Sequence, residues 1–157
     1  MAADAPRPRW FLKIPPPVWT LAMLAFAFAA GPMPFAAGMS WRSLPLAILS
    51  GTLGLALALW AVLTFLAEGT EIEPASASNK KLVTRGPFRF TRNPMYLGLF
   101  LMSLGVAFFM GAWPFFAVPP LVFLLCHFVF IPYEEAKMTR LHGVPYTEYR
   151  ARVRRWI

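Results

Sequence analysis

The feature that most constrains this chain is a stretch of 41 residues, from 93 to 133, without a single Lys, Arg, Asp or Glu. A helix crosses the hydrocarbon core of a bilayer with about 20 residues, so this stretch is long enough to cross twice. It therefore predicts a membrane hairpin whose two ends return to the same face. Polar segments flank it, Arg85 to Tyr96 before the hairpin and Pro132 to Glu135 after it. We expect these distant segments to meet at one membrane face and to form the functional site there.

The composition and the distribution of charge support a membrane protein. Of the 157 residues 58% are hydrophobic and 16% aromatic, and the mean hydropathy is +0.55. Fourteen of the 15 Lys and Arg residues lie in three flanks, residues 7–13, 80–92 and 137–155. Because cytoplasmic flanks are rich in Lys and Arg, we expect both termini in the cytoplasm, the inner membrane in a bacterium, and an even number of spans. We expect the net charge of +8 to be attracted to anionic lipid headgroups, and we expect no nucleic-acid partner.

The first half of the chain predicts two spans. A polar arm over residues 1–13 leads into an uncharged segment, which Gly31-Pro-Met-Pro34 interrupts, so we expect a helix to end or kink near Ala30. Residues 43–67 form a second span, in which Gly51, Gly54 and other small residues offer surfaces for close helix packing.

The second half predicts the hairpin and a polar C-terminal region. A third span is expected over residues 95–110, with Asn93 as its N-cap, and a fourth runs to Ile131 with a kink at Pro119-Pro120. A cytoplasmic helix follows over residues 134–142. Residues 146–157 form a basic amphipathic tail suited to lie on the headgroups.

The fold class expected is therefore an all-α integral membrane protein with about four transmembrane helices and a cytoplasmic C-terminal helix. It forms one domain over residues 1–157. Its parts are a polar arm (1–13), the first two spans (14–67), a cytoplasmic loop (68–94), a helical hairpin (95–131) and a cytoplasmic helix with a basic tail (132–157).

Four polar residues near the membrane face are candidates for chemistry. Glu134 and Glu135 point about 100° apart on a helix, so one can face inward to hold a cation while the other caps the helix or faces solvent. Arg92 lies in a loop shaped by Gly86-Pro87 and Asn93-Pro94 and can hold an anion bidentately. His127 lies seven residues before Glu134 and either serves the site or bonds across helices. His127, His142 and Cys126 do not form a metal-site pattern, and no phosphate-binding glycine loop is present.

Two motifs resemble a known family. Residues 82–98, Leu-Val-Thr-Arg-Gly-Pro-Phe-Arg-Phe-Thr-Arg-Asn-Pro-Met-Tyr-Leu-Gly, resemble the signature of isoprenylcysteine carboxyl methyltransferases and the related phospholipid methyltransferases. Residues 134–149 are similar to the second motif of that family, and the ending Val153-Arg-Arg-Trp-Ile157 is similar to that of its small bacterial members. The resemblance covers residues 70–157.

The resemblance implies S-adenosylmethionine as a methyl donor, bound on the cytoplasmic side without a Rossmann domain. Transferred by position, the expected cofactor contacts are Lys80, Lys81, Leu82, Val83, Phe88, Asn93, Pro94, Met95, Tyr96 and Glu134. Among them Glu134 would meet the ammonium of the methionine end, and Phe88 and Tyr96 would offer aromatic faces. The expected catalytic residues are Arg92, which anchors a reacting group, and Glu135, a base for an amine acceptor.

The acceptor implied is a lipophilic molecule, methylated on a carboxylate or on a phospholipid amine and entering between the third and fourth spans. Phe130 stands where the eukaryotic carboxyl methyltransferases have a substrate-binding arginine, so the resemblance transfers the cofactor and leaves the acceptor open. Two other functions remain open from the sequence. One is a small lipid-binding or scaffold protein, and the other is an NADPH-dependent reductase of the sterol type.

Overall fold

The structure is a computed structural model that describes residues 10–31, 41–69 and 81–157. The helices found there, in chain order, are η1 (Trp10–Lys13), α1 (Pro16–Ala30), α2 (Leu44–Glu68), η3 (Gly86–Arg89), α3 (Pro94–Met110), α4 (Trp113–Leu125), η4 (Cys126–Phe130), α5 (Ile131–His142) and α6 (Val144–Arg152). No strand occurs in these three ranges, as the all-α prediction requires.

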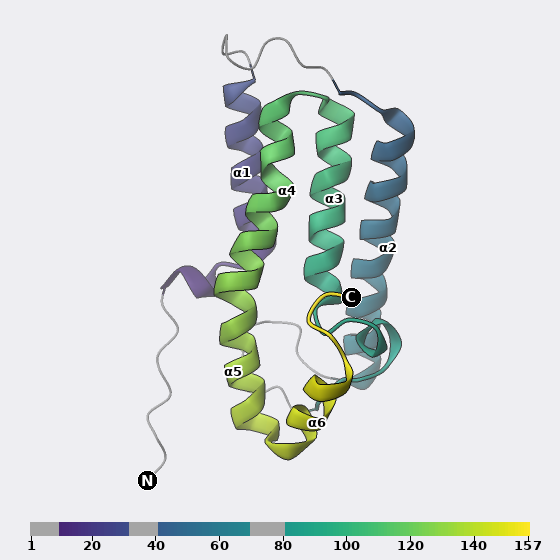
Figure 1. The fold of residues 1–157 in the computed structure, drawn as a ribbon, viewed down its shortest axis with the longest axis vertical. Coiled ribbons are helices and arrows are strands. Elements are labelled where there is room, and N and C mark those ends of the chain that lie inside the picture. The colour runs from purple at the N-terminus through teal and green to yellow at the C-terminus, as the bar shows by residue number, and fades with distance from the viewer. Residues whose placement is uncertain (1–9, 32–40, 70–80) are drawn as a thin grey trace.

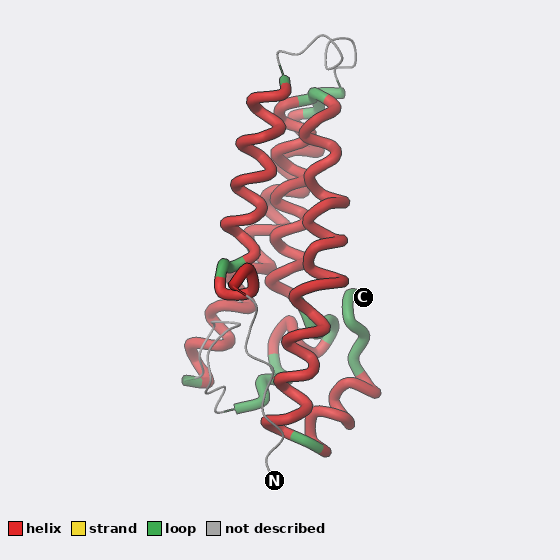
Figure 2. Tube along the Cα trace, turned by 90° about the vertical axis from the view of Figure 1, so that its left-hand side faces the viewer, coloured by secondary structure: helices red, strands yellow, loops and turns green. Residues whose placement is uncertain are grey.

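Helices α1 to α4 stand side by side as an elongated bundle, with α3 and α4 between α1 and α2 (Figures 1 and 2). The chain packs α2 on α3, α3 on α4, and α4 on α1. Helix α5 continues the line of α4 beyond the bundle, α6 turns back, and the C-terminus ends near the base of α3 (Figure 1). The bundle thus has one closed end, where a short turn joins α3 to α4, and another end that carries the polar segments.

Two helical stretches are long and apolar enough to cross a membrane, α2 and the continuous helix Trp113–His142. Helices α1 and α3 are apolar but have only 15 and 17 residues, which is less than the roughly 20 that cross a bilayer without thinning it. The number of four spans therefore stays a prediction.

Small residues allow α2 and α3 to approach closely. A Cβ atom added to Gly98 would lie 2.7 Å from the carbonyl oxygen of Gly54, and one added to Gly105 would lie 2.9 Å from the amide nitrogen of Gly51. Apolar side chains gain little from leaving lipid for a helix interface, so close backbone contact of this kind is what holds membrane helices together. The predicted packing role of Gly54 is confirmed, since a Cβ atom there would lie 2.6 Å from the carbonyl oxygen of Gly98.

Most predicted helix ends agree with the structure. Helix α1 ends at Ala30, and α2 covers the predicted second span. Helix α3 begins at Pro94, whose missing amide hydrogen is harmless in the first turn, and stops at Gly111 with φ of 72°. Asn93 occupies the N-cap position, but its side chain makes no capping hydrogen bond.

The boundary between the fourth span and the cytoplasmic helix was predicted wrongly. No break separates them, because α4 passes through the π-helical turn η4 directly into α5. The amide of Ile131 donates to the carbonyl of Cys126 five residues back. Pro132 has no amide hydrogen to continue the ordinary ladder, and the wider turn accommodates that loss without ending the helix. The prolines predicted to kink the span, Pro119 and Pro120, lie inside α4.

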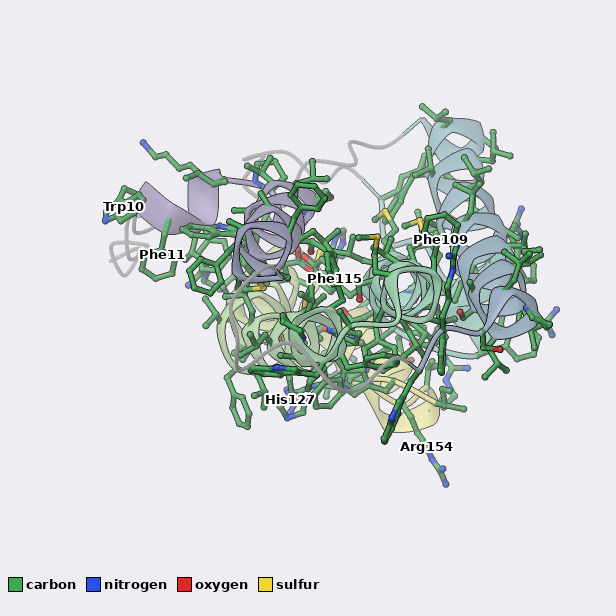
Figure 3. All side chains as sticks on the ribbon, turned by 90° about the horizontal axis from the view of Figure 1, so that it is seen from above. Trp10, Phe11, Phe109, Phe115, His127 and Arg154 are labelled. Atoms are coloured by element: carbon green, nitrogen blue, oxygen red, sulfur yellow. The ribbon has the colours of Figure 1, made fainter. Side chains whose placement is uncertain are left out.

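The predicted position of the basic tail is also wrong in its last part. After α6, residues 153–157 fold back onto the bundle, and we call this segment the C-terminal strap. Its Trp156 ring packs 4.8 Å from the ring of Phe123 and donates from Nε1 to Nδ1 of His127 at 3.0 Å. Figure 3 shows His127 on the side of the bundle that faces this segment. The tail is thus part of the fold and does not lie free on the headgroups.

Candidate functional site

A cavity of about 370 Å³ lies at the end of the bundle that carries the polar segments. Its walls come from the start of α1, the second half of α2, the segment 82–96 with the first turns of α3, and the facing sides of α5 and α6. The volume lies within the range of about 300–1,000 Å³ that small-molecule sites occupy. Residues that the sequence separates by more than a hundred positions therefore surround one space.

The loop before α3 is shaped by its glycine and its aromatic ring. Gly86 has φ of +57° and approaches Thr64 of α2 so closely that a Cβ atom would lie 2.7 Å from its hydroxyl oxygen. Phe88 is buried and packs edge-on against Phe65 of α2 at 4.9 Å. This anchoring brings Leu82, Val83 and Phe88 to the cavity wall.

The start of α3 and the start of α5 meet across the cavity. Asn93, Pro94, Met95 and Tyr96 line it from α3, and the Tyr96 hydroxyl donates to Oε1 of Glu134 on α5. These two side chains are 38 residues apart and flank the uncharged hairpin. The prediction that the two ends of the hairpin meet at one face is therefore confirmed, and a carboxylate is placed in a largely apolar pocket.

Glu135 forms the centre of an ion-pair cluster. Its Oε1 lies 3.1 Å from Nη2 of Arg92, and Arg155 of the strap donates to both oxygens, from Nε at 3.1 Å and from Nη2 at 2.6 Å. The side chain of Glu135 is only 10% exposed. The expectation that one of the two neighbouring acids would cap the helix or face solvent is wrong, because two arginines provide the partners that a buried carboxylate needs.

Arg92 keeps unused hydrogen-bond donors inside the site. Its side chain is 10% exposed, and its Nε and Nη1 atoms are buried without a hydrogen-bond partner in the described part of the protein. Buried donors without partners cost stability, and such groups usually serve a ligand. Since Arg92 lines the cavity, the site offers a positive contact for an anionic group.

Helix α6 closes the cavity with two buried tyrosines, Tyr146 and Tyr149. The Tyr149 hydroxyl donates to the carbonyl oxygen of Phe88 at 2.7 Å and so ties α6 to the loop before α3. Burial raises the pKa of both phenols above the ordinary tyrosine value, while the positive charge of Arg92 acts in the opposite direction on each. Both hydroxyls therefore stay protonated at neutral pH.

The predicted site residues fall into three groups. Ten of them line the cavity: Leu82, Val83, Phe88, Arg92, Asn93, Pro94, Met95, Tyr96, Glu134 and Glu135. Lys81 is exposed and does not line it, and Lys80 lies outside the described residues. His127 is engaged by Trp156 and stacks on Phe123, away from the cavity.

Sequence reasoning missed several walls of the cavity. From α1 and α2 come Pro15, Pro16, Pro17, Ala58, Val62 and Phe65, and from the later helices come Leu99, Met102, Lys137, Met138, Tyr146 and Tyr149. The tyrosines belong to the second motif and were visible there without an assigned role, but apolar residues in a span give no signal of this kind. Access between the third and fourth spans stays a prediction, and α4 contributes no lining residue among those described.

The apolar helical bundle thus carries, at its polar end, one cavity with a buried carboxylate and a buried guanidinium, an arrangement suited to a small charged ligand. Among the described residues no group of three or more His, Cys, Asp or Glu side chains comes together as a metal site would require.

Comparison with known families identifies the kind of protein. A family model described as phospholipid methyltransferase matches residues 43–144. This range covers more than half of the chain and includes α2, α3, α4 and α5, so the chain belongs to the phospholipid methyltransferase family, whose members are membrane methyltransferases. No curated protein and no solved structure showed significant similarity to the chain.

Proposed function

We propose that this protein transfers a methyl group from S-adenosylmethionine to a lipophilic acceptor at the cytoplasmic face of the membrane. The observation that carries the proposal is the cavity in which Tyr96 and Glu134, from opposite ends of the hairpin, meet beside the unpaired donors of Arg92. Membership of the phospholipid methyltransferase family supports the reaction class.

The residues present suit the proposed donor. A zwitterionic methionine end requires a negative partner for its ammonium, and Glu134 offers a carboxylate inside the cavity. Phe88 and Tyr96 offer aromatic faces for a planar base or for the positive sulfonium. Leu82, Val83, Asn93, Pro94 and Met95 complete that wall. When bound, the cofactor supplies an electrophilic methyl group, and no metal is needed to activate it.

Arg92 is the residue that we assign to the acceptor. Its guanidinium lines the cavity and can orient an acceptor carboxylate, or hold the phosphate of a phospholipid whose amine is methylated. Methyl transfer requires the reacting atoms in line and water excluded, so orientation by a fixed guanidinium is the main contribution of the protein. Glu135 already accepts hydrogen bonds at both oxygens, which suits the anchoring of Arg92 better than the removal of a proton.

The cavity lining also indicates how an acceptor reaches Arg92. Ala58 and Val62 of α2 and Leu99 and Met102 of α3 extend an apolar wall away from the charged cluster into the bundle. The start of α1 forms the opposite wall, and α1 and α2 stand on either side of α3 (Figure 3). An alkyl chain can lie along this wall with its polar end at Arg92, so we propose entry from the bilayer between α1 and α2.

The test is calorimetric titration of the detergent-purified protein with S-adenosylhomocysteine, the demethylated product. We expect saturable binding that Glu134→Ala weakens by about tenfold or more, because a charged hydrogen-bonding partner is lost. Glu148→Ala is the matched control, since Glu148 is an exposed acid on α6. NADPH is titrated in parallel. Binding of NADPH alone would support a reductase, and binding of neither by folded protein would leave a lipid-binding scaffold.

A further inference from the structure

The C-terminal strap, residues 153–157, contacts both the segment before α3 and the start of α5, although neither of its arginines lines the cavity. The amide of Arg92 donates to the carbonyl oxygen of Arg154 at 3.0 Å. Thr91 and Asn93 donate from their side chains to the carbonyl oxygen of Arg155, at 3.2 and 2.8 Å. The strap thus fixes the three residues that precede α3, one of which is Arg92.

The side chain of Arg155 contacts the other half of the site, at the start of α5. It spans both oxygens of Glu135 with two hydrogen bonds, and Arg92 reaches the same carboxylate with Nη2 at Oε1. An arginine and a carboxylate alone prefer two parallel hydrogen bonds. Arg155 holds both oxygens of Glu135 and Arg92 makes a single contact with Oε1, while Nε and Nη1 of Arg92 have no hydrogen-bond partner among the described residues.

The net charge of the ion-pair cluster also favours the binding of an anion. Two guanidiniums share one carboxylate, which leaves the cluster of Arg92, Arg155 and Glu135 with a net charge of about +1 by the ordinary ionisation of these groups. A buried positive charge with unused donors is stabilised by an incoming anion. Without Arg155 the pair of Arg92 and Glu135 would be neutral and closed on itself, and the attraction for an anion would be lost.

We propose that Arg155 is a positioning residue that keeps Arg92 open for the anionic group of a lipophilic ligand. It holds both oxygens of Glu135, which makes one contact with Arg92, and so fixes the guanidinium of Arg92 at the cavity wall. The ligand class that follows is an alkyl chain that ends in a carboxylate or a phosphate. The assignment of this ligand as a methyl acceptor rests on the proposed function, whereas the anion site itself does not.

The anchor of the strap explains how Arg155 is held. Trp156 is fixed by its hydrogen bond to His127 and by its contact with Phe123. Arg154, whose side chain extends away from the helices in Figure 3, contributes its carbonyl oxygen to the amide of Arg92. Arg154 and Trp156, the residues before and after Arg155, are therefore both fixed, and they hold Arg155 against Glu135.

The experiment measures ligand binding by the full-length protein in dodecyl maltoside, without any methyl transfer. Dodecyl phosphate and dodecanoate are titrated in separate arms, so that a preference for phosphate or carboxylate is distinguished. We expect Arg155→Ala to weaken the preferred probe by about tenfold, while the affinity for S-adenosylhomocysteine changes by less than about threefold. Arg152→Ala is the control, because Arg152 is an exposed arginine at the end of α6 and removes the same charge.

Two further variants separate positioning from general support of the fold. Arg155→Lys keeps the charge but cannot span both oxygens of a carboxylate, so we expect it to recover only part of the affinity. In a Glu135→Ala background, Arg155→Ala should weaken the probe affinity by less than about a further twofold, since Arg155 can no longer act on Arg92 through Glu135. The thermal unfolding temperature of each variant identifies any that fail to fold, and Arg155→Lys then takes the place of Arg155→Ala.

Three results would overturn the inference. The first is absence of probe binding to the wild-type protein, the second is unchanged probe affinity in Arg155→Ala, and the third is an equal loss of affinity for the probe and for S-adenosylhomocysteine. A wild-type protein that binds the probe but not S-adenosylhomocysteine would instead overturn the proposed function and leave the anion site standing.

Discussion

At the scale of single residues, the site depends on charges that are buried and shared. Glu134 is paired with a tyrosine hydroxyl, whereas Glu135 is paired with two arginines. The same type of side chain at neighbouring positions thus has two different environments and suits two different tasks. Arg92 is the residue that links the ion-pair cluster to the cavity.

Arg92→Ala should abolish most of the methyl transfer. Loss of a charged donor that orients the acceptor is expected to cost about 2–3 kcal/mol in the transition state, roughly a hundredfold in kcat/KM. The rate is measured with radiolabelled S-adenosylmethionine and phosphatidylethanolamine or a farnesylated cysteine. Arg89→Ala is the control, since Arg89 is an exposed arginine of the same loop. Full activity of Arg92→Ala would remove its assigned role.

Tyr149→Phe should detach α6 from the loop before α3. It leaves the carbonyl oxygen of Phe88 without its donor, at an expected cost of about 1–3 kcal/mol in the free energy of unfolding. The unfolding temperature in detergent measures this change. If Tyr149→Phe unfolds at the wild-type temperature, the hydrogen bond contributes nothing to stability.

The same contact should depend on pH in a defined direction. Burial raises the folded-state pKa of Tyr149 above its unfolded value, which is about 10. The stability from the protonated phenol is therefore fully present below about pH 10 and is lost as the pH rises further through the folded-state value. We expect the difference in unfolding temperature between wild type and Tyr149→Phe to be constant from about pH 7 to 9 and to shrink above about pH 10. A difference that shrinks already on the acid side would contradict this assignment.

At the scale of elements, the bundle depends on the glycine contact between α2 and α3. Gly54, Gly98 and Gly105 let the two backbones approach to distances that a side chain would forbid. This contact sets the position of the start of α3, and with it the positions of Arg92, Asn93 and Tyr96. The site is thus built on a helix pair whose close packing depends on residues without a side chain.

Gly98→Ala should destabilise the protein by about 1–3 kcal/mol, because the added methyl group would meet the carbonyl oxygen of Gly54 at 2.7 Å. Gly51→Ala is a matched control on α2, since a Cβ atom there meets nothing within 4 Å. Alanine favours helix over glycine, so the control is expected to be neutral or slightly stabilised. Thermal unfolding followed by circular dichroism compares the two, and equal unfolding temperatures would refute the packing argument.

At the scale of the whole molecule, the polar end of the bundle gathers the loop before α3, α5, α6 and the strap (Figure 1). The closed end holds the turn at Gly111, where the amide of Trp41 donates to the carbonyl oxygen of Gly111 at 2.8 Å. Since the polar end carries most of the Lys and Arg residues, we predict that this end faces the cytoplasm.

This topology is tested by labelling single cysteines in intact cells with an impermeant maleimide. Arg42→Cys, at the closed end, is expected to react from outside, and Arg89→Cys, at the polar end, only after the membrane is opened. The native Cys126 is buried and serves as an unreactive background. Labelling of Arg89→Cys from outside would reverse the orientation, and labelling of neither would place both positions away from the outer surface.

The sequence by itself determined the helical class, the C-terminal end of α1, both ends of α2 and α3, and the pairing of the two motifs at one end of the hairpin. The helix ends follow from local chemistry, because prolines and glycines act within a few residues of their own positions. The pairing of the motifs follows from the length of the uncharged stretch between them. It also singled out ten of the residues that line the cavity, most of them through the resemblance of residues 82–98 to a known family.

Only the tertiary structure decided how those residues are partnered. The continuous helix through η4, the apolar walls from α1 and α2, and the pairing of Glu135 with Arg92 and Arg155 depend on contacts between segments far apart in the chain. The strap is the clearest case, because a basic, aromatic tail has the same composition whether it lies on headgroups or folds onto a buried carboxylate. What decides between them is a buried charge that needs a partner, and that charge is buried only once the helices have packed.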